Sequence, residues 1–193
     1  LLYGQTYHYA GLMVNTNLEY GTASTGSASI QTLTNSQTGF AGGYFLDVHV
    51  SGTNLYAAKD TRGLSIFDIA GGNAVDPQLL SVLAFDGLIK KVHVDGNYAY
   101  VLNQSKGLGI VDITDKSNPI LVKTVTPDEY GFYTGVYATG GYAYLGSLSV
   151  LYIIDVSTPS TASVTGQLTQ YSAKQMVLTG NTLYVTGGSG DID

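Results

Sequence analysis

The sequence predicts an all-β protein made of repeated four-stranded antiparallel sheets, and three observations lead to this class. A unit of about 44 residues recurs along the chain. Each unit holds four short stretches rich in Val, Ile, Leu and Tyr, bounded by Gly, Asn, Asp or Pro, as expected for short strands joined by tight turns. No window of about 11 residues or more shows the 3.6-residue apolar period of an amphipathic helix, so we expect almost no helix.

The repeat is clearest at one turn glycine in each unit. These glycines stand at intervals of 44, 44 and 40 residues: Gly52, Gly96, Gly140 and Gly180. A tyrosine follows each glycine by four residues: Tyr56, Tyr100, Tyr144 and Tyr184. Many positions therefore match at one period, which is the sequence signature of a repeat architecture.

Strand boundaries can be read from the second unit. Its four predicted strands are Lys90 to Val94, Tyr98 to Leu102, Leu108 to Ile113 and Ile120 to Val125. Four antiparallel strands in a unit of this length are typical of a β-propeller blade. A single blade cannot cover both apolar faces of its sheet, but two flanking blades can. We therefore expect a β-propeller with about four blades in view, inner strands along a central channel and outer strands facing solvent.

The domain prediction follows from the same repeat. Residues 1–193 form a single β-propeller domain or part of one, with a partial blade at 1–45, full blades at 46–88, 89–132 and 133–173, and a partial blade at 174–193. In the first partial blade we expect a third strand at 11–15, an extended loop over 21–29 and an outer strand at 28–34. The strand number is close to that of a closed four-blade ring, in which the N-terminal strands complete the last blade. A piece of a longer propeller is the favoured alternative.

Two short segments resemble a known family. GLSIFDI from Gly63 and GLGIVDI from Gly107 look like the LVIVD repeat, found in bacterial and archaeal surface-associated propellers. GNYAYV from Gly96 is similar to that family's second strand, as is GGYAYL from Gly140. The third unit departs from the pattern, because it has Val150-Leu151 in place of Gly-Leu. The resemblance implies a propeller in a surface or secreted setting, and it assigns no catalytic residue to the repeat.

Composition excludes several classes of protein. Charged residues make up 11% of the chain and the net charge is −6, so no basic stripe exists for nucleic acid. The longest apolar runs are too short for membrane insertion. Without cysteine there is no disulfide framework, zinc finger or thiol nucleophile. The first ten residues lack the features of a signal peptide, and the chain begins with Leu1, so we expect a processed or excised chain or part of a longer one.

Aspartates close the third strand of three units: Asp68, Asp112 and Asp155. We expect these carboxylates to cap the following turn by accepting backbone N–H bonds, with metal binding as the alternative. His49 and His93 share one position of the inner strand. They could converge on a metal, but Tyr137 and Val177 stand at the equivalent positions, so blade packing is the favoured reading. We predict no metal, no cofactor and no catalytic residue.

Other segments give weaker signals. The aromatics Tyr130, Phe132 and Tyr133 fall between two blades and are not explained by the repeat, so they are predicted to form a contact patch. Asn103 begins an Asn-Gln-Ser sequon in a predicted turn and is a candidate glycosylation site. Residues 188–193 are interpreted as a turn into a further strand, because their two aspartates are too few for a calcium loop.

Together these features predict a function. We expect a non-catalytic extracellular or cell-surface propeller that serves as a protein-interaction or adhesion scaffold, with other protein chains, including copies of itself, as partners. One alternative is a structural subunit of a surface layer or filament, assembled through exposed strand edges. A second alternative is an enzyme with its site in the propeller channel.

Overall fold

The computed structural model describes residues 6–11, 24–29, 44–71, 77–128 and 131–187, and within them the chain is built almost entirely of antiparallel strands. Three sheets have four strands each. They comprise β3 (Phe45–Ser51), β4 (Asn54–Lys59), β5 (Gly63–Asp68) and β6 (Gln78–Leu83); β7 (Ile89–Asp95), β8 (Tyr98–Asn103), β9 (Gly107–Asp112) and β10 (Ile120–Val125); and β11 (Tyr133–Thr139), β12 (Tyr142–Ser147), β13 (Val150–Asp155) and β14 (Ser163–Thr169). The helical content described is two short 3-10 turns, η1 (Asp60–Arg62) and η3 (Pro159–Thr161). The predicted strands of the second unit are confirmed to within one or two residues at each end.

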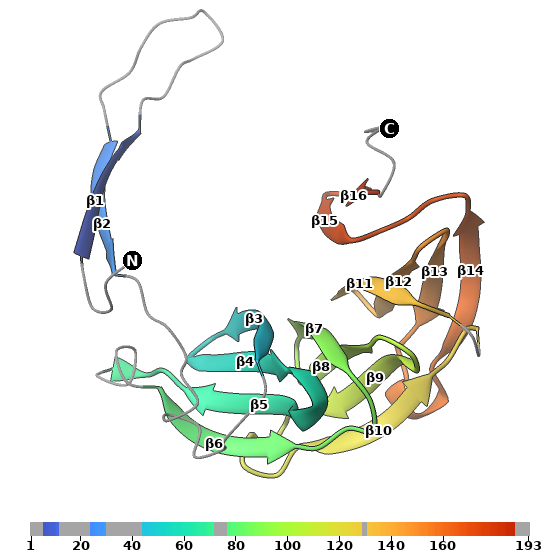
Figure 1. The fold of residues 1–193 in the computed structure, drawn as a ribbon, viewed down its shortest axis with the longest axis horizontal. Helices are drawn as coiled ribbons and strands as arrows, with labels where there is room; N and C mark the ends of the chain where they lie inside the picture. The colour runs from blue at the N-terminus through green and yellow to red at the C-terminus, as the bar shows by residue number, and fades with distance from the viewer. Residues whose placement is uncertain (1–5, 12–23, 30–43, 72–76, 129–130, 188–193) are drawn as a thin grey trace, which may run out of the picture.

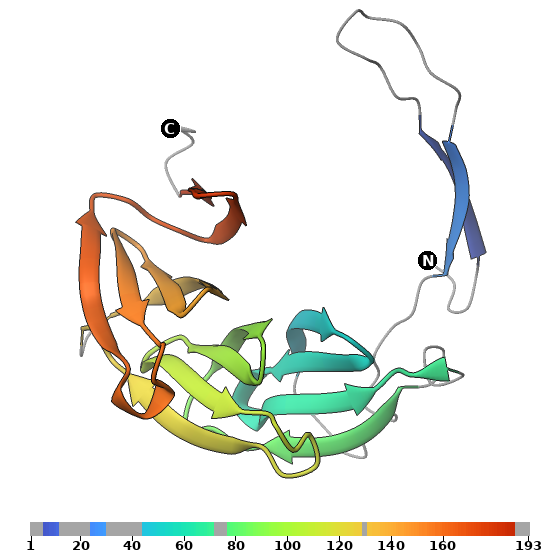
Figure 2. The same ribbon diagram turned by 180° about the vertical axis from the view of Figure 1, so that it is seen from behind.

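Two further sheets have two strands each. One pairs β15 (Gln175–Thr179) with β16 (Thr182–Thr186), and the other pairs β1 (Thr6–Gly11) with β2 (Ser24–Ser29). In both ribbon views the three full sheets follow one another along an arc (Figures 1 and 2), with β3, β7, β11 and β15 on its inner side and β6, β10 and β14 on its outer side. The β1–β2 hairpin stands apart from these sheets. Wedge-like sheets turned around a common axis are the blades of a β-propeller, as predicted.

The N-terminal strands differ from the prediction. β2 runs through Ser24–Ser29, inside the stretch expected to be a loop, and it pairs with β1 over its full length. Backbone pairing with β1 makes this segment a strand, because its small polar residues have little preference for strand structure. The third strand was predicted at 11–15, but only Gly11, the last residue of β1, lies in the described part of that range. Residues 30–34 of the predicted outer strand also lie outside the described residues.

A glycine begins the third strand of the first two blades for a steric reason. Gly63 and Gly107 have φ values of +97° and +95°, a backbone region that is nearly closed to other residues. A Cβ on Gly107 would overlap the carbonyl oxygen of Val125, where β10 ends beside β9, and a Cβ on Gly63 would overlap the matching carbonyl of Leu83. This explains the glycine of the GLSIFDI and GLGIVDI segments.

The third blade replaces this glycine with Val150. Its connection from β12 to β13 is shorter than the connection from β8 to β9. The Ser147 hydroxyl oxygen accepts the Val150 N–H at 3.0 Å and the Ser149 N–H at 3.4 Å, which holds the tighter turn. The departure from the repeat is therefore a change of turn, not of blade.

Apolar side chains are buried at the joints between blades. One buried cluster joins the first and second blades and includes Tyr56, Ile66, Val92 and Val94, and a second joins the second and third blades. The place of a blade along the arc decides how far the side chains of its inner strand are buried. Val92 and Val94 of β7 are 3% and 7% exposed, whereas their equivalents on β3, Val48 and Val50, are 52% and 55% exposed. Each blade thus covers the next one, as expected for a repeat protein.

Candidate functional site: the mouth of the central channel

A backbone irregularity recurs at the start of each full blade's inner strand. The pairing of inner strand with second strand skips one residue in each case, namely Leu46 in β3, Lys90 in β7 and Thr134 in β11. Such a β-bulge leaves the extra residue outside the ladder and redirects its side chain. Lys174, just before β15, follows Thr134 by 40 residues and completes the series at the offset seen for the turn glycines.

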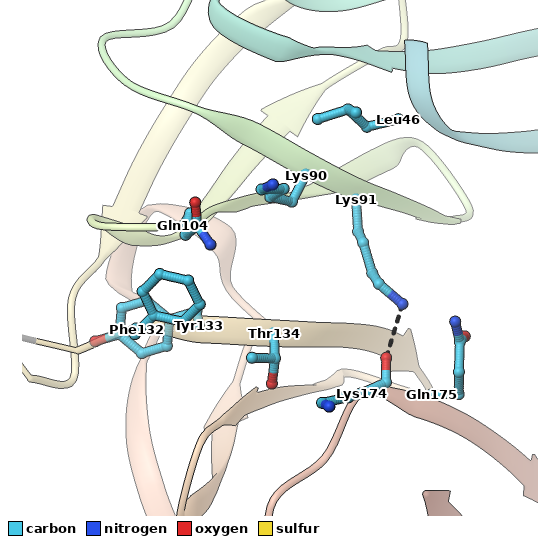
Figure 3. A pocket seen from close by; sticks show the side chains of 9 residues that line it. All are labelled: Leu46, Lys90, Lys91, Gln104, Phe132, Tyr133, Thr134, Lys174 and Gln175. Atoms are coloured by element: carbon cyan, nitrogen blue, oxygen red, sulfur yellow. Dashed lines mark hydrogen bonds between the residues drawn. The ribbon is translucent and has the colours of Figure 1, made fainter. Parts of the chain in front are cut away.

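These four side chains line one pocket of about 440 Å³ (Figure 3). The remaining lining residues are Lys91, Gln104, Phe132, Tyr133 and Gln175. Leu46, Lys90 and Thr134 sit at the same end of three successive inner strands, and Lys174 directly precedes β15. The pocket therefore lies at that end of the inner side of the arc, where a propeller has the mouth of its central channel. We call these nine residues the mouth pocket.

The mouth pocket is cationic in an acidic chain. It holds Lys90, Lys91 and Lys174, three of the eight Lys and Arg residues, and none of its nine residues is acidic. The Lys91 ammonium donates a hydrogen bond to the carbonyl oxygen of Lys174 at 2.7 Å, which links β7 to the segment before β15 (Figure 3). Burial lowers the pKa of Lys91, and the nearby Asp47 carboxylate opposes this shift. Within the described residues, the ammonium groups of Lys90 and Lys174 form no ion pair.

Deeper in the channel wall, three rings from successive blades stand in a row. The centroids of His49 and His93 are 4.7 Å apart, and those of His93 and Tyr137 are 4.4 Å apart. Nδ1 of His93 accepts the Ala138 N–H at 3.2 Å, which joins the second blade to the third. Burial, and then the neighbouring His49, lower the pKa of His93 to about 4, while Asp95 opposes the shift. His93 is therefore neutral at pH 7, with one nitrogen used in a joint between blades.

Two inner-strand aspartates make similar joints. Asp47 Oδ2 accepts the Val92 N–H at 3.0 Å, and Asp95 Oδ2 accepts the Gly140 N–H at 3.1 Å. Side chains of the inner strands thus fasten each blade to the backbone of the next. Among the described residues, no group of three or more His, Cys, Asp or Glu side chains is placed to hold a metal ion.

The three strand-end aspartates each accept a backbone N–H two residues further along. Asp68 Oδ1 accepts from Ala70 at 2.9 Å, Asp112 Oδ1 from Thr114 at 2.8 Å and Asp155 Oδ1 from Ser157 at 2.9 Å. Hydrogen bonds to the side chains and backbones of Thr114 and Ser157 lower the pKa values of Asp112 and Asp155. Tyr98 pairs with both Asp95 and Asp112, so these carboxylates lie at the end of the second blade opposite the mouth pocket.

The predicted contact patch is only partly supported. Tyr130 lies outside the described residues, and Phe132 is 48% exposed and lines the mouth pocket. Tyr133 was predicted to be a surface contact, and this is wrong, because it begins β11 and is 1% exposed. Its ring packs against Tyr152 at 6.3 Å, and its hydroxyl donates to the Asp128 carbonyl at 2.8 Å. The sequence could not show that the strand starts at Tyr133 and turns this ring into the core.

Asn103 is not suited to glycosylation in the folded chain, so that prediction is also wrong. The residue ends β8 and is 3% exposed. Its Nδ2, the atom that a glycan would modify, donates to the Asp86 carbonyl at 2.8 Å. Its Oδ1 accepts the N–H groups of Ser105 and Lys106, both at 3.3 Å. The Asn103 side chain thus shapes the turn from β8 to β9.

Residues 188–193, interpreted above as a turn into a further strand, lie outside the described residues.

Sequence reasoning missed the mouth lysines. The available signal was the shared repeat position of Leu46, Lys90, Thr134 and Lys174, but these residues differ in chemistry and do not stand out in an alignment of the units. Their importance comes from the bulge, which a simple alternation of inward and outward side chains does not reveal.

The four-stranded blades, their arrangement along an arc and the repeated joints between them define a β-propeller protein. The LVIVD-repeat profile matches residues 42–81, 86–126 and 131–169, and the chain belongs to this family. No curated protein shows significant sequence similarity to the chain. In the part of the chain described by the structure, no helix is long and apolar enough to cross a membrane.

Solved structures share the fold at low sequence identity. The chain is similar to the computationally designed Ika4 protein (TM-score 0.62, 11% identity), with 78% of this chain and 89% of Ika4 covered. It is also similar to the β-propeller domain of Cps50 (Swd1) from Myceliophteria thermophila (TM-score 0.57, 15% identity, 78% and 51% covered). A third similarity is to a chain in a mitotic checkpoint complex (TM-score 0.62, 16% identity, 87% and 49% covered). The chain thus spans about half the length of the last two proteins.

Proposed function

We propose that this propeller is a non-catalytic extracellular or cell-surface protein that serves as a protein-interaction or adhesion scaffold. The mouth pocket carries the proposal. It is a recess of about 440 Å³, within the size range of ligand sites, and it presents ammonium, amide and exposed apolar groups side by side. Such a set can hold a partner's side chains through hydrogen bonds and apolar contact.

The chemistry near the channel favours binding over catalysis. No carboxylate or imidazole lies among the nine pocket residues to serve as a partner for a nucleophile. His93, deeper in the channel wall, has a pKa of about 4, which is too low for a general base that works at neutral pH. These observations support the interaction role against an enzyme in the channel.

The extracellular setting rests on the family resemblance and on the low content of charged residues, 11%. The role in protein interaction is supported by the fold, since one structural neighbour is a chain in a mitotic checkpoint complex. An antiserum against the purified chain, applied to intact and permeabilised cells of the source organism, tests the setting. Labelling of intact cells is expected, and labelling only after permeabilisation would contradict it.

Saturable binding tests the interaction role. Fluorescently labelled protein should bind intact cells of the source organism, and unlabelled protein should compete for the same sites. Binding that increases linearly with concentration and is not reduced by competitor would refute a specific scaffold.

A structural subunit is the second candidate, and one observation favours it. Val48 and Val50 on β3 and Tyr184 on β16 are 52–59% exposed, although their equivalents at the inner joints are buried. Tyr56, the first-blade equivalent of Tyr184, packs in the cluster that holds Val92 and Val94. Within the described residues, the exposed faces of β3 and β16 match the two halves of one kind of joint, so a second copy of the chain could pack against either of them.

Light scattering after size exclusion tests this assembly. Mass should rise above 20.3 kDa as concentration increases, and Val50→Lys should shift the chain towards the monomer, because it places a charge in the joint. The matched change Lys123→Gln on the outer strand β10 should leave the mass unchanged. A monomer at every concentration would rule out the structural-subunit candidate.

A further inference from the structure

The mouth pocket concentrates positive charge against the sign of the whole molecule. Three ammonium groups lie around one recess, while the chain carries a net charge of −6. Lys91 is engaged with the Lys174 carbonyl, and Asp47 lies near enough to affect its charge. Lys90 and the Lys174 ammonium make no ion pair within the described residues. Among the described residues, these are the two ammonium groups of the pocket that form neither an ion pair nor a hydrogen bond, and they are the cations offered to a ligand.

Apolar and amide groups flank the two available lysines. Phe132 and Leu46 are 48% and 42% exposed, although both line the pocket, so each offers apolar area to a bound molecule. Gln104 and Gln175 add amide groups that can pair with a peptide backbone (Figure 3). Charge alone would suit any anion, whereas an exposed aromatic ring beside amides suits a peptide.

The extent of the positive charge limits the size of the anion. Nucleic acid requires a basic stripe that follows many phosphates, whereas this pocket gathers only three of the eight Lys and Arg residues of an acidic chain. A short segment with one or two carboxylates matches that area.

We propose that the mouth pocket binds a short acidic peptide segment of a partner protein, with Asp or Glu carboxylates at Lys90 and Lys174 and an apolar side chain of the same segment on Phe132 or Leu46. This proposal rests on the interaction role above and specifies the chemistry of the partner. The bulges in β3, β7 and β11 provide the means, because each leaves one residue outside the ladder, and that residue differs from blade to blade.

Fluorescence anisotropy with labelled peptides tests the proposal at low salt. The probe is a hexapeptide of Gly, Asp, Glu, Phe, Asp and Gly, and its control has Asn and Gln in place of the acidic residues. The acidic probe should bind and the amide control should bind at least about tenfold more weakly, because the paired charges are lost. The double variant Lys90→Gln/Lys174→Gln should also lose about tenfold in affinity for the acidic probe.

Two further variants separate the pocket from general attraction. Lys123→Gln removes one positive charge on the outer strand β10, away from the pocket, and should change affinity less than twofold. Phe132→Ala should weaken binding of the acidic probe severalfold, with thermal melting used to confirm that each variant folds.

Any of four results would overturn the proposal: no binding of the acidic probe at millimolar protein, equal binding of the amide control, an equal loss in Lys123→Gln, or displacement of the probe by inorganic phosphate at concentrations where chloride has no effect. The last result would assign the pocket to small anions instead of a peptide. If Lys90→Gln/Lys174→Gln keeps saturable binding to cells, the scaffold role stands and only the assignment of this pocket fails.

Discussion

Replacement of Gly107 by alanine should destabilise the second blade strongly. The residue has φ of +95°, and holding a non-glycine residue in so unfavourable a region costs about 1–3 kcal/mol. The added Cβ would also overlap the Val125 carbonyl oxygen, so β10 must shift away from β9. Overpacking of this kind costs about 1–3 kcal/mol. The sum, about 2–6 kcal/mol, is a large part of the stability of an ordinary domain.

Urea unfolding followed by far-UV circular dichroism measures this loss. The matched control is Gly96→Asn in the hairpin turn, where φ is +58° and no atom lies near the site of a Cβ. Asparagine tolerates that left-handed region, so the control should lose less than about 1 kcal/mol. A Gly107→Ala protein within about 0.5 kcal/mol of the unmodified chain, or no less stable than the control, would refute the steric explanation of the repeat glycine.

Two further predictions concern the channel wall and the core. As pH falls, His93 takes up a proton near pH 6.5 in the unfolded chain but only near pH 4 in the folded chain. The contribution of this histidine to the free energy of unfolding is therefore present above pH 6.5 and is lost between pH 6.5 and pH 4. Allowing for the partial exposure of His93, we expect the free energy of unfolding, measured by urea titration, to fall by roughly 1–2 kcal/mol across that window. The loss should be smaller in His93→Asn, which keeps an acceptor for the Ala138 N–H. Equal losses in the two proteins would contradict the assignment. Leu145→Ala removes a side chain with no exposed surface and should cost about 2–5 kcal/mol by the same assay, whereas a loss below about 1 kcal/mol would show that this joint is loosely packed.

The fold was largely predictable because its determinants repeat. Turn glycines, strand tyrosines and closing aspartates recur at one period, so an error in one unit could be checked against the next. The N-terminal segment has no such check. Its β2 strand is made of small polar residues that resemble a loop, and only pairing with β1 makes it a strand.

The site was less predictable, because it depends on where single side chains point. The sequence located the strand-end aspartates, whose hydrogen bonds are local and lie within two residues. It misplaced Tyr133 and Asn103, since burial of these side chains depends on where a strand begins or ends. It missed Lys90, because a bulge redirects a residue without leaving a compositional mark, and it missed Lys174, which lies just before a strand.

Hydrogen–deuterium exchange of equivalent inner strands tests most directly whether each blade depends on its neighbours. β3 and β7 each pair with one strand of their own sheet, so their backbone ladders are alike. β7 belongs to the blade between two full blades and carries Val92 and Val94, which are 3% and 7% exposed, whereas Val48 and Val50 on β3 are 52% and 55% exposed. Amides of β7 should exchange at least about tenfold more slowly than those of β3, because opening β7 also breaks joints to two blades. Equal exchange rates in the two strands would contradict the account.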